Sequence, residues 1–454
     1  MKSSIICVET ARRACRRVLT AAFISLAALS AAAAVEYSYE NDGKTYVAEV
    51  SVAETAISDE AIAVLNANEV TNFVVRGSAR LVVDKSSTFT GDVHVTTAMR
   101  LSAVNALGIG PGKIYVKESN FAMSGGTIMK EVDFDCGTGW NNNTAIAGWG
   151  GYGTSTFEKA VTYSDRNLTV YPYTNSCVVF KGGIVGPGTV PVRQCGGGTV
   201  VFTNMPISLG SGYPLSFYEQ NHFDTSGFAS HFIFAVAGNS FQRYGHPTYR
   251  PAFHELRTTV DWAFDNANMA MHFGYDSKWD LCGTSQRIGY FDFTCTTGSP
   301  STSGNRSVVT NSSEASAMLY VTQTANATPA AVFGGNLSVD FSGNKTTTID
   351  YANTARGGIT VNAGTLAFSA NGSWANATNV TVNGSAKITI ANAGALGKKT
   401  KVSLAANSSL EIASGLMVTV RSLTVGGVKM PDDDYTFGSG TLRVINPGLI
   451  LIFR

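Results

Sequence analysis

Charged residues are scarce in this chain of 454 residues. Asp, Glu, Lys and Arg make up only 14% of it, with a formal net charge of +1, whereas an ordinary soluble domain has about 25% charged residues. A nucleic-acid-binding protein would carry a basic surplus, so the composition excludes that class. The hydrophobic share of 44% excludes a charge-rich disordered chain. A coiled coil or helical bundle is excluded because Gly, Thr, Asn and Ser replace the expected Ala, Glu, Lys and Leu.

Long hydrophobic runs are also lacking, and the longest apolar stretch lies in a predicted signal peptide, residues 1–34. Lys2 and four arginines precede apolar residues 18–29, and small residues 30–34 supply an Ala-x-Ala cleavage site. This stretch is too short for a comfortable membrane span, and no lipobox cysteine lies near the cut. We expect cleavage after Ala34, which removes five bases and one acid and leaves a formal charge of −3. The sequence predicts export, to the cell surface or beyond or to the periplasm, from a Gram-negative type of bacterium.

The C-terminal third contains an internal repeat. Apolar-x-apolar triplets begin at residues 366, 388 and 410, with a spacing of 22, and a second set begins at residues 359, 380 and 402. Each triplet alternates as a half-buried strand does, and Asn and Gly, which suit tight corners, lie between the triplets. Two short strands per 22 residues predict one coil of a β-solenoid, whose inward aliphatic side chains are buried only when coils stack.

The same template occurs near the N-terminus. Four segments there match four segments of the C-terminal third in the same order. Residues 93–95 match 380–382, and Leu101 matches Ile388. Residues 106–108 match 395–397, and residues 114–116 match 402–404. We therefore predict an all-β solenoid that begins early and ends late. Its expected parts are N-terminal coils at 35–135, an aromatic, loop-rich continuation at 136–300, and regular coils with an end strand at 301–454.

Several segments resemble the autotransporter-associated β-strand repeat, and the match is closest at residues 358–366. The others are residues 75–83, 88–93, 105–108, 180–189, 196–202 and 280–289. The resemblance implies a right-handed parallel β-helix in an exported, surface-associated protein, without catalytic residues. The chain departs from a complete autotransporter because the repeat runs almost to Arg454 and leaves no room for the C-terminal membrane barrel.

The region 136–300 holds four of the five tryptophans: Trp140, Trp149, Trp262 and Trp279. One interpretation is that these aromatic residues pack into longer coils. The alternative is a carbohydrate- or partner-binding surface on protruding loops.

Five cysteines remain after cleavage: Cys136, Cys177, Cys195, Cys282 and Cys295. In an oxidising compartment the most plausible pairs are Cys177 with Cys195 and Cys282 with Cys295. The favoured alternative is that the cysteines are small apolar residues of the interior stack. Their spacings match no zinc motif.

The histidines, the acidic residues and the sequence motifs predict no metal or catalytic site. His222, His231, His246, His254 and His272 have no ligand-like spacing, so no metal is expected. The acidic residues Asp432, Asp433 and Asp434 follow Pro431 and are interpreted as a solvated turn rather than the carboxylate cluster of a β-helix glycan-cleaving enzyme. Hydrolase, phosphate-loop and zinc-protease motifs are missing.

The sequence therefore predicts a non-enzymatic, exported β-solenoid with a structural or adhesin-like role, no catalytic residues and no cofactor. Its expected partners are glycans or proteins of the cell envelope or the extracellular space, and not nucleic acid. A carbohydrate-binding module in residues 136–300 is one alternative. A β-helix polysaccharide lyase or hydrolase is another, supported only by analogy of fold.

Overall fold

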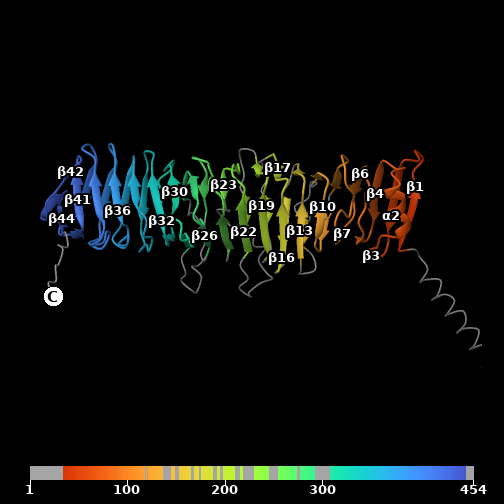
Figure 1. Ribbon diagram of the computed structural model, residues 1–454, viewed down its shortest axis with the longest axis horizontal. Helices are drawn as coiled ribbons and strands as arrows, with labels where there is room; N and C mark the ends of the chain where they lie inside the picture. The colour runs from red at the N-terminus through yellow and green to blue at the C-terminus, as the bar shows by residue number, and fades with distance from the viewer. Residues whose placement is uncertain are drawn as a thin grey trace, which may run out of the picture.

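A computed structural model shows the chain as one elongated rod of stacked coils (Figure 1). The structure describes residues 34–445, except residues 118, 120, 136–144, 149–152, 165–167, 173–174, 188–191, 195–197, 210–214, 218–229, 245–253, 273–276 and 292–306. The predicted signal peptide thus lies almost entirely outside the described residues. Within them, nearly every element is a β-strand, and the helix is α2 (Asp59–Asn66).

In the middle of the rod, between β10 and β31, successive strands enter three different sheets in turn, so the coils there have three faces; towards both ends the strands alternate mainly between two sheets. The first face begins with a nine-stranded sheet, in the order β1 (Val35–Tyr39), β2 (Thr45–Val50), β4 (Asn72–Gly77), β6 (Asp92–Val95), β8 (Ile114–Lys117), β11 (Val132–Asp135), β14 (Val161–Tyr163), β17 (Ile184–Gly186) and β20 (Ser208–Leu209). Isolated bridges join Ser208 to Ser240, Asn239 to Phe264 and Asp265 to Arg287, and so carry this face onward.

The first face then continues in an eight-stranded sheet. Its order is β27 (Ser285–Ile288), β30 (Ala317–Val321), β32 (Leu337–Phe341), β34 (Ile359–Val361), β36 (Asn379–Val382), β38 (Lys401–Leu404), β41 (Ser422–Val425) and β42 (Val428–Lys429).

The second face contains an eleven-stranded sheet and, nearer the C-terminus, a four-stranded one. The larger sheet contains β3 (Thr55–Ala56), β5 (Leu81–Val83), β7 (Met99–Leu101), β9 (Phe121–Met123), β12 (Ala145–Gly148), β15 (Leu168–Pro172), β18 (Val192–Gln194), β21 (Leu215–Phe217), β23 (Arg243–Tyr244), β25 (Ala270–Met271) and β28 (Tyr290–Phe291). The smaller sheet contains β33 (Thr346–Ile349), β35 (Thr365–Phe368), β37 (Lys387–Ile390) and β39 (Ser409–Ile412).

The third face contains a nine-stranded sheet. Its strands are β10 (Gly126–Ile128), β13 (Gly153–Phe157), β16 (Ser176–Phe180), β19 (Thr199–Thr203), β22 (Ser230–Ala235), β24 (His254–Thr258), β26 (Lys278–Asp280), β29 (Ser307–Thr310) and β31 (Ala331–Phe333). A three-stranded sheet of β40 (Met417–Val420), β44 (Gly440–Val444) and β43 (Asp434–Phe437) lies at the C-terminal end. Because the three large sheets all pass through residues 136–300, this region belongs to the same solenoid.

The predicted repeat is confirmed by the strand register. Leu366 pairs with Ile388, which pairs with Leu410, so the triplets of the first set lie on one another in the small sheet of the second face. Ile359, Val380 and Val402 do the same on the first face. All these pairings are parallel, so the fold is a parallel β-helix; its right-handed sense stays a prediction.

Aromatic side chains fill the interior of the middle coils. Phe157 stacks on Phe180 at a centroid distance of 5.1 Å, Phe180 stacks on Phe202 at 5.5 Å, and Phe202 stacks on Phe234 at 5.0 Å. Each of these rings is fully buried. Such ordered stacks add to the free energy of burial, which supports the interpretation that aromatic residues of this region pack into the solenoid.

Both ends of the rod carry antiparallel strands instead of another coil. At the N-terminal end β1 pairs antiparallel with β2, and Tyr37 stacks on Tyr46 at 5.7 Å. At the C-terminal end β41 folds back on β42, and β43 on β44. These antiparallel strands end the parallel stacking in the described part of the chain, and β1 and β42 are the edge strands of their sheets. No helix in the described part of the chain is long and apolar enough to cross a membrane.

A repeated Ala-Leu-Gly corner places glycine against the preceding coil. At residues 106–108 and 395–397 the alanine and leucine are buried. A Cβ atom on Gly108 would lie 2.1 Å from the carbonyl oxygen of Phe89, and one on Gly397 would lie 1.9 Å from that of Ala375. The corner requires glycine because the backbone of the neighbouring coil occupies the space of a side chain.

Substitutions at this corner test the close stacking. We expect Gly397→Ala to destabilise the protein by about 1–3 kcal/mol, because the new methyl group overpacks against a backbone carbonyl that cannot rotate away. The matched control is Gly394→Ala in the same corner, where a Cβ would meet only Asn392 Oδ1 at 3.6 Å. Urea denaturation of both variants measures the difference, and equal midpoints would contradict the stacking argument.

Candidate functional site

Two of the five cysteines lie in the described residues, and neither is in the interior stack. Cys177 lies on the outward side of β16, between buried Ser176 and Val178. Cys282 lies in a corner after β26 with a positive φ of 49°. Both thiols are free, so the two pairings considered from the sequence are not formed. The interior interpretation is wrong for these two residues, while Cys136, Cys195 and Cys295 lie outside the described residues.

Burial keeps both thiols protonated. It raises the pKa of Cys177, and it raises the pKa of Cys282 to about 11 with help from the carboxylate of Asp280. A nucleophilic or metal-binding cysteine requires the opposite shift, because the thiolate is the reactive form.

The histidines of the middle region that the structure describes do not gather at one place. His231 lies on β22, His272 is fully buried, and His254 begins β24. His222 and His246 lie outside the described residues. Within the described ranges, no group of three or more His, Cys, Asp or Glu side chains is arranged to hold a metal ion.

The acidic triplet at residues 432–434 lies at the start of a terminal hairpin. Asp432 and Asp433 are exposed, and Asp434 forms a two-pronged ion pair with Arg443 on β44 at 2.7 and 2.6 Å. The exposure of Asp432 and Asp433 agrees with the interpretation as a solvated turn, and Asp434 is the first residue of β43.

The two described tryptophans of the middle region have different environments. Trp279 on β26 is fully buried, and its indole nitrogen donates a hydrogen bond to Thr258 Oγ1 at 3.2 Å. Trp262 is only half-buried and lies at the surface of the first face. Trp140 and Trp149 lie outside the described residues.

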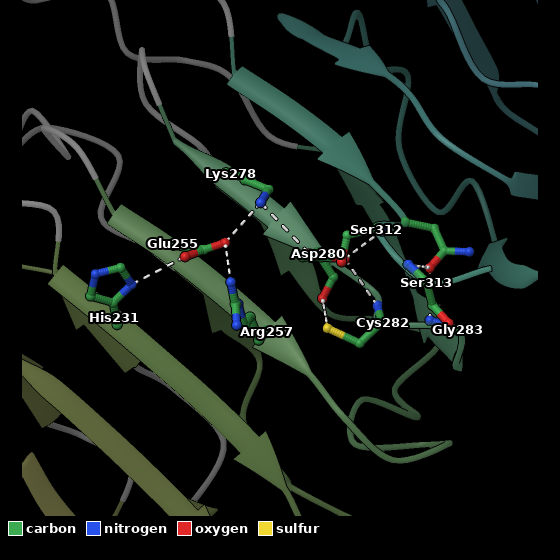
Figure 2. Close-up of polar contacts among 10 residues, drawn as sticks. His231, Glu255, Arg257, Lys278, Asp280, Cys282, Gly283, Ser312 and Ser313 are labelled. Atoms are coloured by element: carbon green, nitrogen blue, oxygen red, sulfur yellow. Dashed lines mark hydrogen bonds and ion pairs between the residues drawn. The ribbon is translucent and has the colours of Figure 1, made fainter. Parts of the chain in front are cut away.

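A cluster of charged and polar side chains lies on the third face, across β22, β24 and β26 (Figure 2). Glu255 is at its centre. Its Oε1 atom accepts hydrogen bonds from Lys278 Nζ at 2.8 Å and from an Arg257 guanidinium nitrogen at 3.2 Å, and its Oε2 atom lies 3.2 Å from His231 Nδ1. The Glu255 side chain is only 15% exposed, so these partners shield the carboxylate from water.

Asp280 is the second carboxylate of the cluster, and its side chain is 1% exposed. Its Oδ1 atom accepts hydrogen bonds from the backbone amides of Cys282 at 3.1 Å and Ser312 at 2.9 Å, and Oδ2 lies 3.6 Å from Lys278 Nζ. Asp280 therefore ties the corner at Cys282 to the next coil. Figure 2 shows Lys278 placed between the two carboxylates.

Both carboxylates have lowered pKa values. Burial alone would raise the pKa of Glu255, but Lys278 and Arg257 outweigh it. Burial would also raise the pKa of Asp280, but the hydrogen bonds from Ser312 and Cys282 and the charge of Lys278 reverse the shift. An acid–base enzyme needs two groups whose pKa values are pushed apart. Here both move down, so neither carboxylate is a proton donor at neutral pH, and the arrangement serves electrostatic cross-linking of coils.

This cluster was not predicted from the sequence, although the spacing of its residues follows the repeat. His231 pairs with Glu255, and Glu255 pairs with Lys278, across successive parallel strands. Their separations of 24 and 23 residues are close to one coil. Opposite charges at this spacing predict an ion pair between neighbouring coils.

Replacing the central carboxylate tests the role of the cluster. We expect Glu255→Gln to destabilise the protein by about 1–2 kcal/mol at neutral pH, because Arg257 loses its anionic partner and Lys278 loses the nearer of its two. Since the pKa of Glu255 is lowered on folding, its stabilisation is present above the pKa of the unfolded chain and is lost as pH falls through the folded value.

Urea denaturation at about pH 7 and about pH 3 measures this effect, and the gap between wild type and Glu255→Gln should narrow in acid. The control is Glu411→Gln, which removes an exposed pair with Lys387 and should change stability little. An equal loss of unfolding free energy in the two variants would refute the role assigned to Glu255. So would a difference between wild type and Glu255→Gln that grows in acid.

Lys130 is a buried cation in the interior, and it too was not predicted from the sequence. It is 1% exposed, and its Nζ donates a hydrogen bond to the backbone carbonyl of Gly91 and lies 4.4 Å from the centre of the Phe89 ring. Burial lowers the pKa of Lys130 to about 8. A lowered lysine pKa is one property of a nucleophile, but this amine is enclosed and bonded to a carbonyl two coils away, so it acts as an internal tie.

The lowered pKa of Lys130 gives a defined pH dependence. Between about pH 8 and about pH 10.5 the unfolded chain holds a proton that the folded chain has released, so folding stability rises with pH in this window. We expect the folding stability of the Lys130→Met variant not to rise with pH in this window. Thermal unfolding of both proteins from about pH 7 to about pH 10 measures it. Lys113→Met is the control, because Lys113 is an exposed residue whose pKa is raised by Glu131, so this variant should follow wild type. A Lys130→Met profile parallel to wild type would contradict the assignment.

Comparisons with family models, curated proteins and solved structures find no match to this chain. The resemblance to the autotransporter-associated repeat therefore stays a prediction, and the site is interpreted from its own geometry.

Proposed function

We propose that this protein is an exported, surface-associated β-solenoid with a structural or adhesin-like role and no enzymatic activity. The observation that carries the proposal is the continuous stacking of coils along the rod. A rod of this kind displays long, regular faces at a distance from its point of attachment, as an extended surface protein requires.

The outward row of the first face supports a display role. Thr360, Thr381, Ser403 and Thr424 pair in register on successive strands, and each is half-buried on the outer side. Their spacing follows the strand separation of about 4.8 Å. The inward neighbours Ile359, Val380, Val402 and Leu423 are fully or almost fully buried. The coil therefore uses its aliphatic residues for the core and its hydroxyl residues for a regular polar surface.

The polar groups buried in the rod fit this role as well. Glu255, Asp280 and Lys130 are each bonded within or between coils. Their contacts and pKa shifts suit cohesion between coils, which a long, thin fold needs because each coil touches only its neighbours.

Export is supported by the order of basic, apolar and small residues in positions 1–34. A second candidate function, carbohydrate binding through residues 136–300, is favoured by the surface position of the Trp262 ring. The two functions are compatible, because an adhesin-like rod can carry a ligand-binding surface.

Cell fractionation tests the proposal. In a Gram-negative host we expect the N-terminal sequence of the purified protein to begin at Val35, and added protease to degrade the protein on intact cells. The matched control carries Leu26→Arg and Leu29→Arg in the apolar stretch, which should keep the protein in the cytoplasm with its N-terminal segment intact. A wild-type protein that keeps residues 1–34 and stays in the cytoplasm would refute export, and one confined to the periplasm would refute the surface role.

A further inference from the structure

We propose that the surface around Trp262, Arg287 and Tyr320 is a binding site for a neutral glycan. This inference rests on the second candidate function above, to which it gives a site and a class of ligand, and it does not depend on export. The three side chains meet on the first face where β27 and β30 lie side by side. The centroid of the Tyr320 ring lies 5.6 Å from that of Trp262, and the Arg287 guanidinium carbon lies 5.4 Å from the centre of the Trp262 ring.

The backbone of Trp262 is the first reason to assign a function here. Its φ of 57° lies in the left-handed region, and it is the one aromatic residue with positive φ in the described part of the chain. A bulky side chain in this region is disfavoured, and such outliers concentrate at functional sites. Two hydrogen bonds between coils hold it there: its amide donates to Ser285 O at 2.8 Å, and its carbonyl accepts from Gly238 N at 2.9 Å. Glycine would suit this backbone conformation better, so the indole occupies the position at a cost in backbone energy.

The chemistry of the surface is the second reason. Tyr320 lies on the outward side of β30, and both aromatic residues are half-buried, so the pair lies at the outer surface of the rod. An aromatic ring of this kind offers an apolar face together with a polar edge. The C–H face of a pyranose ring packs on such a surface, and the sugar hydroxyls bond to nearby polar groups.

Polar side chains with planar amide or carboxylate groups lie beside the aromatic pair, on the next strands of the first face. Tyr320 pairs with Asp340 on the next strand. Both oxygens of Asp340 accept hydrogen bonds from Asn362 Nδ2 at 2.8 Å, and Asn383 Nδ2 donates in turn to Asn362 Oδ1 at 2.8 Å. The chain of bonds fixes these amide and carboxylate groups before a ligand arrives, which lowers the entropy cost of binding. The strand spacing of about 4.8 Å is also close to the rise of one pyranose unit along an extended glycan.

The local charge selects the class of glycan. Arg287 is paired with Asp265 at 3.1 Å, and Asp261 accepts a hydrogen bond from the Ser285 amide at 2.7 Å. With Asp340 these residues give three carboxylates and one guanidinium. The surface is therefore electronegative and disfavours uronic-acid, sialylated or sulfated glycans. A neutral oligosaccharide is the ligand that matches both the rings and the charge.

Titration calorimetry of the purified protein tests the site. The probes are cellohexaose, laminarihexaose, xylohexaose and mannohexaose as neutral glycans, and polygalacturonate and heparin as acidic ones. We expect binding to at least one neutral probe and none to the acidic probes. Trp262→Gly should weaken that binding at least tenfold while leaving the fold intact or stabilised, because glycine fits the left-handed backbone. Tyr320→Ala should also weaken it, and Tyr320→Phe should retain most of it.

The control is Tyr115→Ala. This outward tyrosine stacks on His94 at 4.9 Å on the same face, in a distant coil, and its loss should leave glycan affinity unchanged. Three outcomes would overturn the proposal: no neutral probe binds, only acidic probes bind, or Trp262→Gly binds as wild type does. Because purified protein is used, failure here is separate from failure of the export experiment.

Discussion

The stacking of inward side chains from one coil onto the next is the interaction on which the structure depends. A single coil of about 22 residues encloses too little volume to bury its own aliphatic residues, so each gains burial from its neighbours. The pairs Leu366–Ile388 and Ile388–Leu410 show the regular form of this contact, and the phenylalanine stack from Phe157 to Phe234 shows its aromatic form. Parallel hydrogen bonds fix the register, and a slip by one residue would turn every inward side chain outward.

Regular coils were predictable from the sequence, because there each position in one coil has an equivalent in the next. The triplets at residues 359, 380 and 402 are close to one period apart and lie in register. The middle coils were not predictable in detail, since insertions between strands hide the period. Val308 pairs with Lys278 across a separation of 30 residues, whereas Lys278 follows its partner Glu255 by 23. A fixed spacing cannot align such coils, although their strands pair just as closely.

Polar residues were likewise predictable where local sequence was enough, and not where their contacts reach another coil. The acidic turn at residues 432–434 was predicted from local sequence alone, because a proline and three acids suffice to identify an exposed turn. The cluster around Glu255 depends on residues one coil apart, and Lys130 reaches a carbonyl 39 residues earlier in the chain. Position relative to the coil, rather than residue type, decides whether such a group is exposed or buried. Cys177 illustrates this, because the alternation along β16 places it outward even though its thiol suits the interior.

The stacked coils also explain how a strained residue such as Trp262 persists. A left-handed backbone costs about 1–3 kcal/mol where a bulky side chain is present, and an isolated loop would relax to remove that cost. In the solenoid the Trp262 amide and carbonyl are bonded to the coils on either side, so relaxation would break two hydrogen bonds between coils. The lattice of parallel strands is thus rigid enough to hold single side chains in unfavourable positions on its outer surface. Such a fold needs no cleft to present a binding surface, because the repeat itself fixes neighbouring outward side chains at the strand spacing.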